Sequence, residues 1–75
     1  MKHYKDDCHH YKVLDNHRVV TVTDLGKFST RISFNDFGKE HHIIQDIREK
    51  RAKPCTEKEY LTAFDKALKT INNLK

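Results

Sequence analysis

Histidine and cysteine are the residue types with the most chemistry to offer in this sequence of 75 residues. Most of its six histidines and two cysteines lie near the N-terminus or in the second half: His3, Cys8, His9, His10, His41, His42 and Cys55. None has the paired Cys-x-x-Cys or His-Glu-x-x-His spacing of a zinc site. Adjacent histidines in a strand point to opposite faces, so each pair offers at most one ligand to a common site. We therefore expect no metal site and no cofactor.

A catalytic use of histidine is a minor alternative. General acid and base cleavage of RNA needs two histidines and a nearby cation, which His10, Lys12 and one of His41 or His42 could supply. Ordinary surface histidines account for the same residues. Since the chain also lacks a glycine-rich phosphate loop and a nucleophile elbow, we favour a non-enzymatic protein with no catalytic residues.

Two echoing stretches, Asp24-Leu25-Gly26-Lys27 and Asp36-Phe37-Gly38-Lys39, hold both glycines of the chain. Asp can brace a type I turn, and the glycine can take the left-handed conformation that closes a three-residue hairpin loop. The two stretches therefore predict hairpin turns in an antiparallel meander.

The expected strands lie near residues 9–14, 17–23, 27–34 and 39–44. With a two-residue turn at Asp15-Asn16, the alternation places one apolar set on a single face: Tyr11, Val13, Val20, Val22, Phe28, Ile32 and Phe34. The last segment stays open between strand and helix. Ile43 and Ile44, together with Ile47 just beyond the segment, also fit helical spacing, but the similarity of the two turn stretches favours a strand.

A C-terminal amphipathic helix is predicted at about residues 57–73. Pro54 interrupts any preceding helix, and Thr56 with Glu59 forms a capping-box pattern ahead of an apolar stripe. The fold class is thus α+β, a three- or four-stranded antiparallel meander packed on one face by this helix. We expect one small domain at residues 9–75 after a flexible N-terminus at residues 1–8. The layout resembles that of the three-stranded DNA-binding domains of tyrosine integrases and AP2-type factors, without a shared residue motif.

The other face of the sheet is predicted to carry hydroxyl and cationic groups without a carboxylate, a donor set that suits phosphate contacts. Its candidate binding residues are Lys12, Thr21, Thr23, Ser29, Arg31 and Ser33. A second basic cluster consists of Arg48, Lys50, Arg51 and Lys53. With a formal net charge of +4, these residues favour a binding module for nucleic acid, DNA above all, or for an acidic protein. Single-stranded RNA is less favoured, because this face offers no stacking aromatics.

A protein partner that adds a strand to a sheet edge, at residues 9–14 or 39–44, is the main alternative. No stretch is long and apolar enough to span a membrane, and the N-terminus lacks the apolar run of a secretion signal. We therefore expect a cytoplasmic protein with two reduced cysteines and no membrane partner. The oligomeric state stays open.

Overall fold

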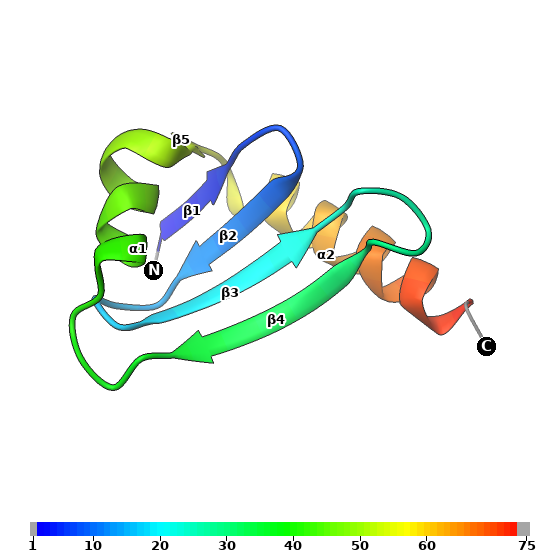
Figure 1. Cartoon of the computed structure of the whole chain (residues 1–75). Helices are drawn as coiled ribbons and strands as arrows, with labels where there is room; N and C mark the ends of the chain where they lie inside the picture. The colour runs from blue at the N-terminus through cyan, green and yellow to red at the C-terminus, as the bar shows by residue number, and fades with distance from the viewer. Residues whose placement is uncertain (1, 74–75) are drawn as a thin grey trace.

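The computed structural model describes residues 2–73, apart from the side chain of Lys50, and shows a five-stranded antiparallel sheet (Figure 1). The order across the sheet is β4-β3-β2-β1-β5. In chain order the elements are β1 (Lys2–Lys5), β2 (His9–Val13), β3 (Arg18–Thr23), β4 (Arg31–Asp36), α1 (His42–Asp46), the π-helical turn η1 (Ile47–Arg51), β5 (Lys53–Pro54) and α2 (Glu57–Asn72). The α+β meander packed against a C-terminal helix is confirmed.

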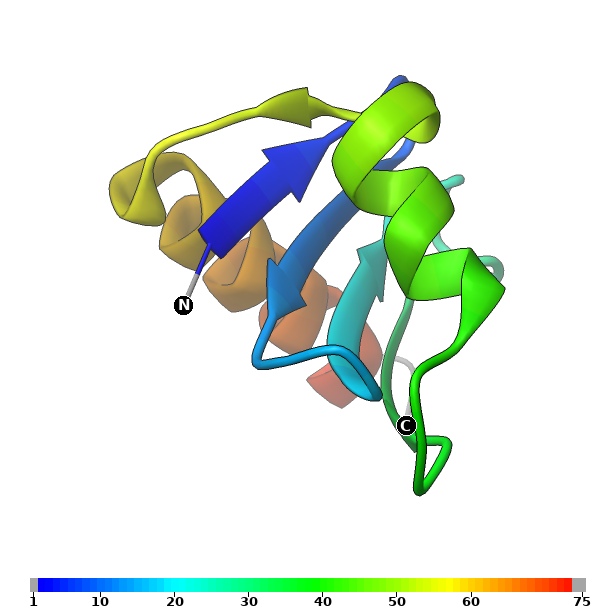
Figure 2. The same cartoon turned by 90° about the vertical axis from the view of Figure 1, so that its left-hand side faces the viewer.

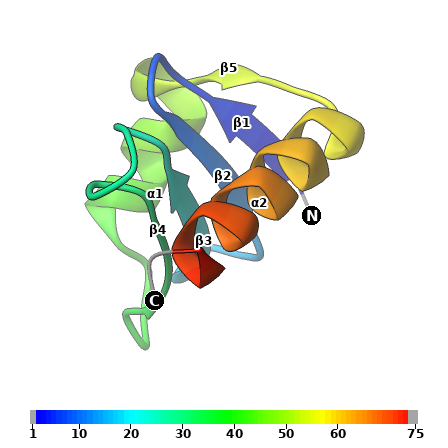
Figure 3. The same cartoon turned by 90° about the vertical axis from the view of Figure 1, so that its right-hand side faces the viewer.

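Helices cover both faces of the sheet. Figure 2 shows α1 and η1 in front of the strands, and Figure 3 shows α2 on the opposite side. We call these the α1 face and the α2 face. The α1 face buries the larger apolar cluster: Tyr4, Tyr11, Val13, Val19, Ile44 and Ile47. The α2 face buries a smaller one: Val22, Tyr60 and Ala67, with Ile32, Ala63 and Phe64 packed against it.

Helix α2 begins at the predicted capping box. The Thr56 hydroxyl accepts from the backbone amide of Glu59 at 3.1 Å, and the Glu59 side chain accepts from the Thr56 amide. Its cover of the sheet is narrower than predicted, since Phe28 and Phe34 are 88% and 58% exposed. Because β4 begins only at Arg31, Phe28 lies in the β3–β4 loop rather than on a strand.

The connection from β2 to β3 has three residues instead of the predicted two. Val13 pairs with Val19, and the amide of Leu14 donates to the Arg18 carbonyl. A one-residue change in register moves every side chain of a strand to the other face. Tyr11 and Val13 therefore lie on the α1 face, and the prediction that they share a face with Val20 and Val22 is wrong.

The segment at residues 39–44 is not a strand, and the second Asp-Phe-Gly-Lys stretch is not a hairpin. Gly38 has a φ of 75°, as predicted, but the chain then leaves the sheet and enters α1. The His41 ring accepts from the backbone amide of Ile43 at 3.1 Å and caps this helix. Ile44 and Ile47 are each 1% exposed. The helical spacing of the isoleucines was therefore the better predictor of this segment than the similarity of the two turn stretches.

The N-terminal segment and the first predicted hairpin turn also differ from the prediction. Lys2–Lys5, expected to be flexible, form β1 because Tyr4 supplies an apolar anchor opposite Tyr11. The first Asp-Leu-Gly-Lys stretch belongs to a loop of residues 24–30, wider than a three-residue turn. Gly26 has the predicted positive φ, at 104°, and its carbonyl accepts from Ser29 and Thr30.

Among the described residues, no helix is long and apolar enough to cross a membrane.

Candidate functional site: a groove on the α1 face

A groove of about 370 Å³ opens on the α1 face, where α1 and η1 cover only part of the sheet. It is lined by His9, Tyr11, Val19, Thr21, Thr23, Arg31, Ser33, Asn35, Phe37, Ile43, Ile47 and Arg51. Strands β2, β3 and β4 form the floor, and α1 with η1 forms one side. The lining therefore joins residues that are far apart in the sequence.

The pairing of β3 with β4 sets the polar part of the floor. Thr21 lies opposite Ser33, and Thr23 lies opposite Arg31, so the four side chains point to one face. This arrangement was predicted for Thr21, Thr23, Arg31 and Ser33. Thr23 is almost fully buried, while Arg31 is exposed at the rim.

Two arginines contribute positive charge from different layers of the fold. Arg31 comes from the edge strand β4, and Arg51 comes from the last residue of η1. Within residues 2–73, neither guanidinium forms an ion pair or a side-chain hydrogen bond to a described residue. Both are exposed and available to an anion from solution.

The groove lining contains no Asp or Glu. Asp6 lies outside the lining and bonds to the lining residues His9 and Tyr11. Burial raises the pKa of Asp6, but hydrogen bonds from Tyr11, His9 and the Cys8 amide outweigh it, so the pKa lies below its usual value. The carboxylate is thus ionised and already supplied with donors.

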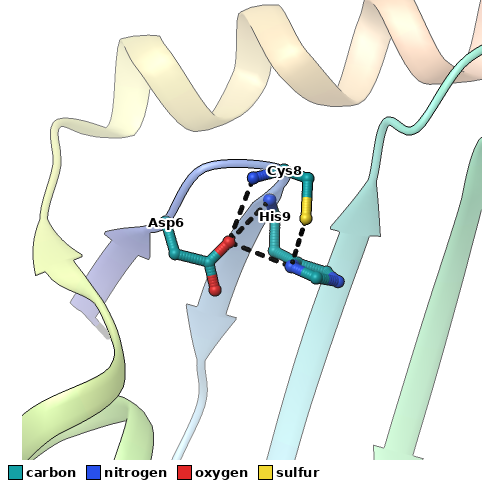
Figure 4. Close-up of side chains that lie close together, drawn as sticks. All are labelled: Asp6, Cys8 and His9. Atoms are coloured by element: carbon teal, nitrogen blue, oxygen red, sulfur yellow. Dashed lines mark hydrogen bonds and ion pairs between the residues drawn. The ribbon is translucent and has the colours of Figure 1, made fainter.

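Asp6, Cys8 and His9 converge at the β1–β2 turn (Figure 4), and His9 is the one of the three that lines the groove. Asp6 Oδ1 accepts from the backbone amides of Cys8 and His9 at 3.2 and 2.9 Å, and it lies 2.9 Å from His9 Nδ1. Cys8 Sγ lies 3.1 Å from the same nitrogen. Behind them, the Tyr11 hydroxyl donates to Asp6 Oδ2 at 2.8 Å. Burial, followed by this hydrogen bond, raises the pKa of Tyr11 above its usual range.

The other predicted binding residues lie elsewhere. Lys12 pairs with Val20 and therefore lies on the α2 face, while Ser29 is in the β3–β4 loop. Arg48 donates to the Asn16 side chain at 2.8 Å, and Lys53 is exposed on β5. The Lys50 side chain lies outside the described part of the structure. The groove thus brings together four residues predicted on the open sheet face and Arg51 from the second basic cluster. The four sheet residues are Thr21, Thr23, Arg31 and Ser33.

The residues of the predicted ribonuclease site are not assembled. His10 and Lys12 lie on the α2 face, whereas His41 and His42 lie at the start of α1, on the other side of the sheet. His10 instead lines a hollow of about 450 Å³ beside α2. Two of its three acidic residues pair with lysines, Glu59 with Lys5 and Asp24 with Lys66, and Asp7 is the third. Because the hollow is lined by these carboxylates, it suits an anion less well than the groove does.

Three further lining residues were not among the predicted binding residues: His9, Asn35 and Phe37. His9 falls on the predicted face because the β2–β3 loop has three residues, and Asn35 continues the alternation of Arg31 and Ser33 because β4 extends to Asp36. Phe37, predicted to lie in a hairpin turn, is half-buried and stacks on His41 with 3.8 Å between ring centroids. No family model matches the chain, and the searches of curated proteins and of solved structures found no significant match.

Proposed function

We propose that this protein is a small non-enzymatic binding module whose groove holds the backbone of a nucleic acid. The observation that carries the proposal is the composition of the lining: two arginines and no carboxylate among the groove residues. Arginine binds phosphate through paired N–H groups, and it does so best where no carboxylate competes.

Neutral donors complete the polar surface. Hydroxyls of Thr21 and Ser33, with the amide of Asn35, follow β3 and β4 across the floor. Hydroxyl and amide groups make a large share of the contacts that proteins form with phosphate and sugar. A strand of nucleic acid crossing the floor would meet these donors and reach Arg31 at the rim.

The shape of the groove favours a single strand over a duplex. Because α1 and η1 rise from the same face, the sheet does not present a flat platform to a double helix (Figure 2). The aromatic ring of Phe37 stands beside the floor, and single-strand binders combine a basic groove with aromatic side chains. The sequence alone gave no reason to expect an aromatic group here.

Resonance mapping tests the location. A single-stranded oligonucleotide of about ten nucleotides is added to labelled protein at low salt, and amide shifts are followed. We expect the largest shifts at Thr21, Arg31 and Ser33, with Thr62 and Lys66 of α2 as unaffected references. Shifts confined to α2 would overturn the proposal.

A second candidate function is pairing with a protein strand, and the position of β4 favours it. Strand β4 is an edge of the sheet, and Phe34 on it is 58% exposed. The edges predicted from sequence are wrong: β2 is interior, and residues 39–44 form no strand. Binding by strand addition should depend little on salt, whereas phosphate contacts weaken steeply as salt rises.

A further inference from the structure

We propose that Asp6, Cys8 and His9 form a binding site for a zinc-type divalent cation. This inference is independent of the proposed nucleic-acid contact. It assigns the protein a second binding function, located at the β1–β2 turn. One oxygen, one sulfur and one nitrogen lie within 4.8 Å of one another. Nitrogen and thiolate donors together select zinc over magnesium or calcium, which prefer oxygen alone.

The two contacts of His9 Nδ1 show why a cation suits this arrangement. Nδ1 lies 2.9 Å from Asp6 Oδ1 and 3.1 Å from Cys8 Sγ, so two groups compete for one ring nitrogen. That nitrogen carries at most one proton, and an N–H there cannot also accept the thiol proton. A cation accepts lone pairs from all three atoms at once. The second ring nitrogen points away from the cluster, as Figure 4 shows, and can keep the proton.

Little movement is needed to admit the ion. With zinc bonds of about 2.0 to 2.3 Å at tetrahedral angles, the ligand atoms stand roughly 3.3 to 3.6 Å apart. The present separations of 2.9 and 3.1 Å from His9 Nδ1 therefore need to open by about half an ångström, and the third separation, from the Asp6 ligand oxygen to Cys8 Sγ, is within 4.8 Å. Asp6 Oδ1 keeps its two backbone donors, and the ion takes the place of the His9 N–H.

The turn is already held in position. The amide of Asp6 donates to the His9 carbonyl at 3.0 Å, and the amide of Asp24 donates to the Cys8 carbonyl at 2.9 Å. The Tyr11 hydroxyl fixes the outer oxygen of Asp6, as a supporting group does for many metal-bound carboxylates. A rigid backbone and an oriented carboxylate reduce the ordering that metal binding would require.

Charge and access also fit zinc. A thiolate and a carboxylate balance the two positive charges of the ion, and the histidine is neutral. The side chains of His9 and Asp6 are 27% and 22% exposed, so an ion can enter from solution. Three protein ligands leave a fourth position for water.

Cobalt titration of the reduced full-length protein tests the site, because Co²⁺ substitutes for Zn²⁺ and reports thiolate ligation by charge-transfer absorption. We expect a one-to-one complex showing that absorption. Cys8→Ser and His9→Asn should each weaken binding by about tenfold or more, and Cys8→Ala provides a second test of the thiol. The matched controls Cys55→Ser and His10→Asn should change the affinity by less than about twofold.

Zinc should also raise the thermal midpoint of the wild-type protein but not of Cys8→Ser, because an ion that binds only the folded state stabilises it. Circular dichroism of each variant without metal shows whether the fold is kept. The proposal is overturned if no stoichiometric complex forms, if folded Cys8→Ser and Cys8→Ala bind as the wild type does, or if Cys55→Ser abolishes binding.

Discussion

The hydroxyl of Tyr11 donates a 2.8 Å hydrogen bond to Asp6 Oδ2 and ties β2 to the turn that precedes it. Tyr11 is 5% exposed. Tyr11→Phe keeps the ring and removes the donor, so it should lower the free energy of unfolding by about 1.5 kcal/mol, measured by urea denaturation. Tyr60→Phe is the matched control: Tyr60 is 3% exposed, and its hydroxyl bonds to no described residue. Equal losses in the two variants would show that the bond contributes nothing specific.

The layer formed by α1 and η1 should contribute a large part of the stability. Ile44 is 1% exposed and packs against the buried side chains of β2 and β3. Ile44→Ala should cost about 2 to 5 kcal/mol in chemical denaturation, because it leaves a cavity in this core. Leu25→Ala removes a similar side chain that is 60% exposed, and it should change stability by about 0.5 kcal/mol or less. A small effect at Ile44 would mean that α1 does not pack on the sheet.

The elements that could be predicted are those with local signals. Helix α2 was predicted nearly to the residue, since Thr56, Glu59 and the apolar stripe act within the segment. The strands β2, β3 and most of β4 followed from alternation. Strand β1 could not be predicted, because the burial of Tyr4 depends on a neighbour that only the folded sheet supplies.

The groove floor was predicted in part, although the predicted pairing of β2 with β3 differs from the observed one by one residue. The β3–β4 loop is longer than predicted by an even number of residues, so the same side chains of the two strands still share a face. These are Thr21, Thr23, Arg31 and Ser33. The β2–β3 loop carries no glycine to mark its length, and the added residue moved His9 and Tyr11 to the groove face. Arg51 joined the site only through tertiary packing of η1.

Gly38 should tolerate asparagine better than valine. Its φ is 75°, and no atom lies within 4 Å of a Cβ built there, so the cost of a side chain comes from the backbone alone. Gly38→Val should destabilise the protein by about 1 to 2 kcal/mol. Gly38→Asn should cost about half of that or less, since asparagine adopts this conformation more readily. Thermal or urea unfolding measures both, and similar costs for the two variants would argue against a left-handed Gly38.

Asp15 should make the free energy of unfolding depend on pH. The Arg18 side chain, followed by the backbone amide of His17, lowers the pKa of Asp15 to about 2. Because this folded-state pKa lies below the unfolded one, the contribution is present above pH about 4 and is lost as the pH falls towards 2. The stability difference between wild type and Asp15→Asn should therefore shrink over this range. Resonance titration gives the pKa directly, and a value near the model-peptide value of 3.8 would contradict the pairing.

The most direct test of the groove is a binding titration of a fluorescent single-stranded oligonucleotide at two salt concentrations, about 50 and 200 mM. Arg31→Glu and Arg51→Glu reverse charges that line the groove, whereas Lys12→Glu makes a similar change on the α2 face. We predict a loss of about tenfold or more at low salt for each arginine variant, a shallower salt dependence, and a change within about twofold for Lys12→Glu. Equal losses in all three variants, or no binding by the wild type at low salt, would contradict the account.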